Sequence, residues 1–144
     1  MISIVRTIFE ILYLLSILFL IKQYINLFRN VVALRRETKT SIGSKNKKLD
    51  RAIRAHANFC ETVPIAILLT MILYFHNLLY IALPSLLMLV IGRIIHAKAI
   101  SNINENINMR VIGMRLTIYS IKVSSFGIIF YILQIIYYYF KSGY

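Results

Sequence analysis

The sequence predicts an all-α membrane protein: one domain, residues 1–144, built as a four-helix transmembrane bundle with up-down topology. Apolar residues make up 59% of the chain and the mean hydropathy is +0.72, well above the values of soluble domains. The sequence also contains four long apolar stretches, and about 20 such residues suffice to cross a bilayer as a helix. Four spans and their connections use the whole length, so no soluble catalytic domain fits beside them.

The apolar stretches give the limits of the expected spans. The stretch at the start has no small-residue cleavage site after it, which favours a retained helix over a removed signal peptide. Short polar segments separate the stretches, and the longest of these, residues 29–50, contains the turn-forming residues of the main loop. The four expected spans cover residues 2–28, 49–75, 79–98 and 110–140.

The distribution of charge predicts the orientation of the chain in the membrane. Basic residues gather in the segment 29–50, as the positive-inside rule predicts for a cytoplasmic loop. The segment 99–110 then lies on the same side, and both termini lie outside, in the periplasm. The abundance of Ile, Asn, Lys and Tyr and the short length favour a bacterial inner membrane. The net charge of +12 reflects loops beside anionic membrane lipids, so we expect no nucleic acid partner.

A polar stripe opens the second span. Arg51, Arg54, Asn58 and Glu61 follow the i, i+3, i+7, i+10 spacing of one helix face. The next Lys, Arg, Asp or Glu is Arg93, so Glu61 lies inside the membrane, where a charged group costs roughly 2.5–3.5 kcal/mol. Two interpretations remain open: snorkelling arginines with a carboxylate paired for packing, or a site that binds a charged ligand at the membrane edge.

Two further polar sets lie at a similar depth on the third and fourth spans. Arg93 and His96 are three residues apart and share a helix face, whereas Arg115, Tyr119 and Lys122 follow an i, i+4, i+7 spacing. The predicted cytoplasmic third of the membrane contains Arg93, His96 and Arg115, together with Arg54, Asn58 and Glu61 of the second span. The role of Lys122 is not explained by the sequence.

An energetic argument predicts that these sets converge. Left unpaired in the membrane, Glu61, Arg93 and Arg115 would together cost on the order of 8–10 kcal/mol. We therefore expect them to share a hydrated cleft between helices. Such a cleft carries surplus positive charge and one carboxylate, which suits a small zwitterion with several carboxylates and one amine.

The second-span motif resembles a family signature. Arg54-Ala-His-x-Asn58-x-x-Glu61-x-x-Pro64 is similar to the second-helix signature of the MAPEG family, the membrane-associated proteins in eicosanoid and glutathione metabolism. The chain length and the spacing of the apolar stretches resemble this family over nearly the whole chain. The resemblance implies a homotrimer with sites at the subunit interfaces, and glutathione as cosubstrate. Some family members bind lipids or partner proteins without chemistry.

The resemblance also implies roles for single residues. Arg35 resembles one of the basic pair that ends the family's first helix and contacts the cosubstrate. Arg110-x-x-Gly-x-Arg115-Leu-Thr resembles the start of the fourth helix, where the arginine faces the thiol; a slipped alignment would give Arg110 that place instead. Tyr119 matches a tyrosine of the prostaglandin-synthase branch. The resemblance therefore implies Arg115 as the catalytic residue and a glutathione site of Arg35, Arg54, Asn58, Glu61, Arg93, His96 and Tyr119.

Two positions depart from the eicosanoid branch of the family. Ile100 stands where those enzymes have a tyrosine, and Ala57 stands where they have another arginine. These departures argue against the substrate chemistry of the eicosanoid enzymes and leave two functions open within the family. One is a glutathione transferase or peroxidase acting on a small lipophilic electrophile, and the other is a non-catalytic lipid- or partner-binding member.

In the enzyme hypothesis, the arginines hold the glutathione carboxylates, Glu61 its amine and Asn58 a backbone amide. Arg115 then favours the thiolate, which attacks the electrophile. A third hypothesis, a small transporter, predicts internal repeat symmetry that the sequence does not show. No metal is expected, because the single cysteine and the three histidines lack ligand spacing. We expect Cys60 to be buried and unreactive.

Overall fold

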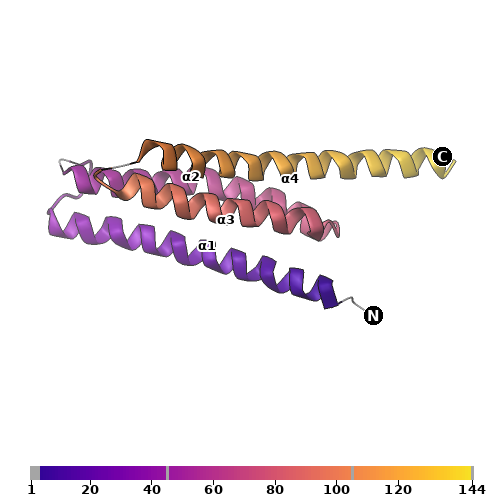
Figure 1. Ribbon diagram of the computed structural model, residues 1–144, viewed down its shortest axis with the longest axis horizontal. Helices are drawn as coiled ribbons and strands as arrows, with labels where there is room; N and C mark the ends of the chain where they lie inside the picture. Colours follow the sequence, from indigo (N-terminus) through magenta and orange to yellow (C-terminus); the bar gives the residue numbers. More distant parts are fainter. Residues whose placement is uncertain (1–3, 45, 105, 144) are drawn as a thin grey trace.

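The computed structural model describes residues 4–44, 46–104 and 106–143, which form four helices and their connections (Figure 1). Each helix is long and apolar enough to cross a membrane, which confirms the predicted all-helical membrane fold. The ends of the helices do not give the membrane boundaries, so the predicted span limits stay predictions. The helices are α1 (Ile4–Glu37), α2 (Lys47–Phe75), α3 (Leu79–Ser101) and α4 (Ile107–Lys141).

Helices α2 and α3 form the centre of the bundle. Helix α1 packs against both of them, α4 packs against both of them, and α1 does not contact α4 within the described residues. In Figure 1, α1 and α4 accordingly lie on opposite sides of the molecule. The α1–α2 and α3–α4 connections lie together at one end, which we call the loop end. The C-terminal part of α4 projects past the other helices at the opposite end.

Asparagines begin two of the helices. The Asn46 side chain accepts hydrogen bonds from the backbone N–H groups of Lys48, at 2.8 Å, and Leu49, at 3.3 Å. The Asn106 side chain accepts one from the N–H of Met109 at 3.2 Å. Both side chains satisfy donors that the first turn of a helix leaves without a partner. The caps therefore fix where α2 and α4 start at the loop end.

Small residues bring α3 and α4 into close contact. A Cβ atom added to Gly113 would lie 2.6 Å from the backbone nitrogen of His96, so only glycine fits there. Further along, Ser85 Oγ donates to the carbonyl oxygen of Ser120 at 2.7 Å and lies 2.6 Å from Ser124 Oγ. Small side chains and hydroxyl hydrogen bonds are the usual means of packing membrane helices closely. This contact sets the position of the polar residues of α3 relative to α4.

Tyrosines join α1 to α2 at the other end. Tyr13 OH donates to Thr70 Oγ1 at 3.3 Å, and Tyr74 OH donates to Glu10 Oε1 at 3.0 Å. Glu10 is separated from Lys22 by too much of the helix to pair with it. The hydrogen bond from Tyr74 gives its carboxylate a partner on another helix, which lowers the cost of a carboxylate on an apolar helix.

Candidate functional site

The centre of the candidate site is Arg93, whose side chain is 1% exposed between α2 and α3. Its Nη1 atom donates to Asn58 Oδ1 at 2.8 Å and to Thr62 Oγ1 at 3.0 Å. Asn58 and Thr62 lie one turn apart on α2, so both face the same point on α3. The structure thus joins two of the predicted site residues, Asn58 and Arg93, and adds Thr62 to them.

The other edge of the same guanidinium has no partner. Nε and Nη2 of Arg93 are buried, and neither makes a hydrogen bond within the described part of the chain. A buried donor without a partner costs about 1–3 kcal/mol, and more when it is charged. The Nε and Nη2 groups together form the edge that binds a carboxylate with two parallel hydrogen bonds. This edge of Arg93 therefore has the donor geometry that matches a planar anion.

Two contacts hold the backbone around Arg93. Gln23 on α1 donates through Nε2 to the carbonyl oxygen of Arg93 at 2.9 Å. His96, one turn further along α3, is 5% exposed, and its Nδ1 atom lies 3.1 Å from the carbonyl oxygen of Arg110. His96 thus ties α3 to the first turn of α4, and Gln23 ties α1 to α3 at the level of the arginine.

The remaining predicted residues of α2 and α4 lie on exposed faces. Arg54, Glu61 and Arg115 are exposed, and none of the three has a hydrogen bond or ion pair within residues 4–44, 46–104 and 106–143. Tyr119 is 51% exposed, and the Lys122 ammonium lies 5.9 Å from the centre of its ring. Within the described residues of a single chain, neither Glu61 nor Arg115 therefore pairs with Arg93.

The comparison with protein families gives one match. The model of the MAPEG family matches residues 11–138, which is most of the chain. The chain belongs to the MAPEG family. Neither the curated proteins nor the solved structures that were searched contain a match to this MAPEG chain. Its membership and its four apolar helices make it an integral membrane protein of that family, in a lipid environment.

Arg35 of this MAPEG chain has a local role. Its Nη1 atom donates to the carbonyl oxygens of Thr40, at 3.3 Å, Ser41, at 2.9 Å, and Gly43, at 3.3 Å. These bonds fold the α1–α2 connection back against the end of α1. In a single chain, Arg35 therefore organises the loop end and is separate from the Arg93 site.

Cys60 of the MAPEG chain is exposed, so the expectation that it is buried is wrong. Hydropathy places this part of α2 in the membrane but does not say which residues face other helices. The Cys60 thiol lies 3.6 Å from Nε2 of His56, whose ring packs against Tyr24 and Phe28. Within the described residues, no three His, Cys, Asp or Glu side chains form a possible metal site.

Two residues of the site were missed in the sequence. Thr62 follows Asn58 by one helical turn, so its hydroxyl lies on the same face of α2. It could therefore have been predicted as a second acceptor for Arg93. Gln23 is a carboxamide inside the apolar run of the first helix, where a polar group needs a partner. Both residues are uncharged, and so they do not stand out in an analysis based on charged groups.

Proposed function

We propose that this MAPEG chain binds glutathione and promotes the attack of its thiolate on lipophilic electrophiles or peroxides dissolved in the bilayer. The observation that carries the proposal is the buried Arg93 with two unpartnered donors, Nε and Nη2. Glutathione has two carboxylates and one amine, and either carboxylate matches the free edge of the guanidinium. The use of glutathione in the MAPEG family gives independent support for this ligand.

The partners of Arg93 support a role in binding. Because Asn58 and Thr62 both accept from Nη1, the plane of the guanidinium is held before any ligand arrives. A binding group that is already oriented loses less conformational freedom on binding, which favours affinity. Asn58 also has a second role in the proposal, because its amide can meet the peptide backbone of glutathione.

The exposed charges support a site completed by neighbouring copies. Glu61 on α2 and Arg115 on α4 would each cost roughly 2.5–3.5 kcal/mol if they faced lipid near the middle of the membrane. We propose a homotrimer in which the exposed faces of α2 and α4 from adjacent subunits cover one another, with up-down helices crossing the membrane. The site then contains Arg54, Glu61 and Tyr119 beside Arg93 and His96, with Arg35 at its loop end.

Arg115 is the proposed catalytic residue. A cation beside the sulfur of glutathione stabilises the thiolate, and each unit by which the thiol pKa falls corresponds to about 1.36 kcal/mol. The proton leaves to solvent, the sulfur forms a bond to the electrophilic carbon, and the leaving group departs with the bonding electrons. With a peroxide, the sulfur bonds to one oxygen while the O–O bond breaks and an alcohol leaves, and a second glutathione then converts the sulfenic acid to the disulfide with release of water. Glu61 holds the amine of glutathione and so orients the molecule.

The proposed location follows from the charge pattern. We place the protein in a bacterial inner membrane with both termini in the periplasm and the site near the cytoplasmic, loop end, where the basic residues gather. Arg93 lies eight residues before the end of α3, which at 1.5 Å per residue is about 12 Å from that end. This depth lets a polar cosubstrate arrive from one side and an apolar electrophile from the bilayer.

The test compares binding with turnover in lipid nanodiscs. Calorimetry measures glutathione binding, and the absorbance of the conjugate with 1-chloro-2,4-dinitrobenzene measures transfer. We expect Arg115→Ala to keep most of the affinity but lose on the order of 100-fold in kcat, as removal of a group that stabilises developing charge does. Arg29→Ala, at an exposed position on α1 outside the proposed site, is the matched control. Turnover that is unchanged in Arg115→Ala would remove the proposed mechanism.

A second candidate is a non-catalytic member that binds glutathione or lipid. Ile100 and Ala57 favour it, because each removes a polar side chain that the eicosanoid branch has at that position. The same measurements separate the two functions. Binding of glutathione without turnover of any electrophile would favour the second candidate.

A further inference from the structure

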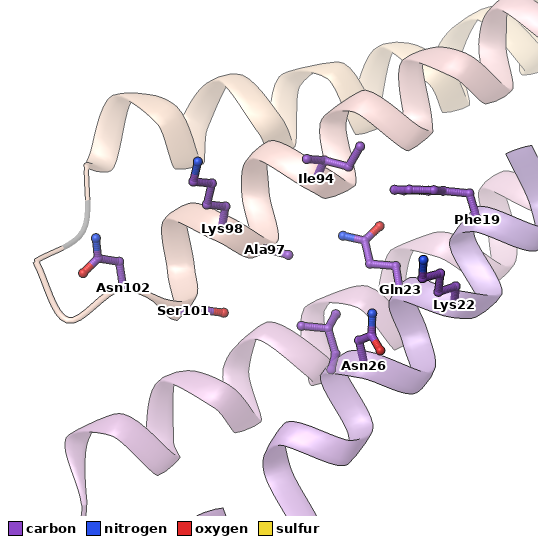
Figure 2. Close-up of a pocket in the computed structure, with 10 residues that line it drawn as sticks. Phe19, Lys22, Gln23, Asn26, Ile94, Ala97, Lys98, Ser101 and Asn102 are labelled. Atoms are coloured by element: carbon purple, nitrogen blue, oxygen red, sulfur yellow. The ribbon is translucent and has the colours of Figure 1, made fainter.

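A groove of about 540 Å³ lies between α1 and α3 on the side of the molecule shown in Figure 2. Its lining residues come from these two helices and from Asn102, which caps the end of α3, and it contains neither Arg93 nor any exposed residue of the glutathione site. The groove shares Gln23 with the contacts around Arg93 but is otherwise separate from that site.

Both walls of the groove change in the same way along their length. Helices α1 and α3 both run toward the loop end (Figure 1). On α1 the lining passes from Phe19 through Lys22 to Asn26, and on α3 it passes from Ile94 to Lys98 and on to Asn102. Phe19 and Ile94 thus lie at the end of the groove nearer the middle of the bundle, with Lys22 one turn from Phe19, and the end nearer the loops is mostly polar, with Leu27 among its lining residues. This gradient matches an amphiphile that points its head toward the loop end.

The groove is positively charged. Lys22 on α1 stands beside Phe19, Lys98 on α3 stands nearer the loop end (Figure 2), and no lining residue is acidic. Neither lysine has a hydrogen bond or ion pair within the described part of the chain. Two ammonium groups beside an apolar channel favour an occupant that joins an anion to a hydrocarbon chain. Asn26 and Asn102 add neutral donors further toward the loop end on α1 and α3.

We propose that the α1–α3 groove binds one anionic phospholipid, with its phosphate between Lys22 and Lys98 and an acyl chain along Phe19 and Ile94. The charge and the polarity gradient argue for this occupant over a neutral lipid, which would leave both ammonium groups unpaired. They also argue against a free phosphate, which would not cover the apolar end. Membrane-spanning helices are surrounded by lipid, so phospholipid molecules are in reach of the groove.

Native mass spectrometry of the detergent-purified protein tests the proposal. The probes are phosphatidylglycerol and phosphatidylcholine with identical acyl chains, each added at increasing ratios. We expect the protein to retain the anionic lipid preferentially. Each basic residue near an anionic lipid surface contributes roughly fivefold in binding, so Lys22→Gln with Lys98→Gln should reduce the preference by roughly 30-fold.

Lys47→Gln with Lys48→Gln is the matched control, because it removes the same charge from exposed positions at the start of α2. The control pair should keep the preference. Circular dichroism and a melting curve establish that all variants fold, which is expected for exposed lysines. Equal loss in both pairs, or no preference for the anionic lipid in the wild type, would overturn the proposal.

A second variant and a competitor test the geometry. Ala97→Phe puts a large side chain into the groove and should weaken both lipids, because it fills the space that the acyl chain occupies. Soluble glycerophosphate should compete weakly, because it has the head group alone. Full displacement by glycerophosphate or inorganic phosphate would show an anion site instead of a lipid site, and would also overturn the proposal.

Discussion

Replacing Arg93 by leucine should leave the fold about as stable as before but remove glutathione binding. In the structure, the guanidinium is buried and, among the residues described, only Nη1 has partners, Asn58 and Thr62. Nε and Nη2 are buried without a partner among the described residues. Leucine removes the charge and these two unpartnered donors, which destabilise the folded state. It also removes the two hydrogen bonds of Nη1, which stabilise the folded state.

The opposing contributions are of similar size. A hydrogen bond to a charged group contributes about 1.5–3 kcal/mol, so the two bonds of Nη1 contribute roughly 3–6 kcal/mol. Two unpartnered buried donors cost roughly 2–6 kcal/mol, and burial of the charge adds to that cost. The midpoints of these two ranges nearly cancel, so we expect the free energy of unfolding to change by only about 2 kcal/mol. Loss of one partner of a buried charge pair in a complex costs about 2–5 kcal/mol, which is roughly 30- to 5,000-fold in affinity.

Two measurements on the same preparation check this prediction. Unfolding in one detergent, followed by circular dichroism, gives the change in stability, and calorimetry gives the affinity for glutathione. Arg29→Leu, an exposed position on α1, is the control for loss of a positive charge. Arg93→Lys, which keeps the charge without the two-donor edge, should have intermediate affinity. A loss of more than about 3 kcal/mol in stability with unchanged affinity would show that Arg93 is structural and would refute the reasoning.

Three further predictions concern the packing, the positioning of Arg93 and the loop end. Gly113→Ala should lower the free energy of unfolding by about 1–3 kcal/mol, because the added Cβ would lie 2.6 Å from backbone on α3. Gly127→Ala, whose Cβ would be 3.0 Å from flexible side chains, should be milder in the same melting assay, and an equal effect would contradict this account. Asn58→Leu should weaken glutathione binding by roughly tenfold in calorimetry, because Nη1 loses one of its two partners; unchanged affinity would count against the positioning role. Arg35→Ala should speed proteolysis of the α1–α2 connection, since three carbonyl bonds are lost, whereas the exposed neighbour in Arg36→Ala should have no effect.

Hydropathy and helical spacing predicted most of the fold. Four long apolar stretches give four helices, because a helix in a membrane satisfies all its backbone hydrogen bonds internally. The contact between Asn58 and Arg93 could also be predicted, because a buried cation on one span needs hydrogen-bond acceptors from another span. The use of Gly113 against α3 was not predicted, because a glycine in an apolar run gives no sign of which helix it meets.

The sequence could not predict what the polar face of each helix packs against. Spacing shows that residues share a helix face, but packing decides whether that face meets another helix, lipid or a second chain. Glu61 and Arg115 therefore lie on exposed faces, where the sequence predicted a shared cleft with Arg93. Cys60 was expected in the interior for the same reason. Residues that act through neutral hydrogen bonds, such as Gln23, carry no charge signal and were missed.

The most direct test of the account is a thermodynamic cycle between the guanidinium edge of Arg93 and one carboxylate of glutathione. Calorimetry with glutathione and with two analogues, each having one carboxylate converted to an amide, is carried out on the wild type and on Arg93→Leu. We predict that one analogue binds the wild type at least tenfold more weakly than glutathione does, and that this difference disappears in the variant. The same loss in both proteins for both analogues would contradict the claim that Arg93 binds the carboxylate.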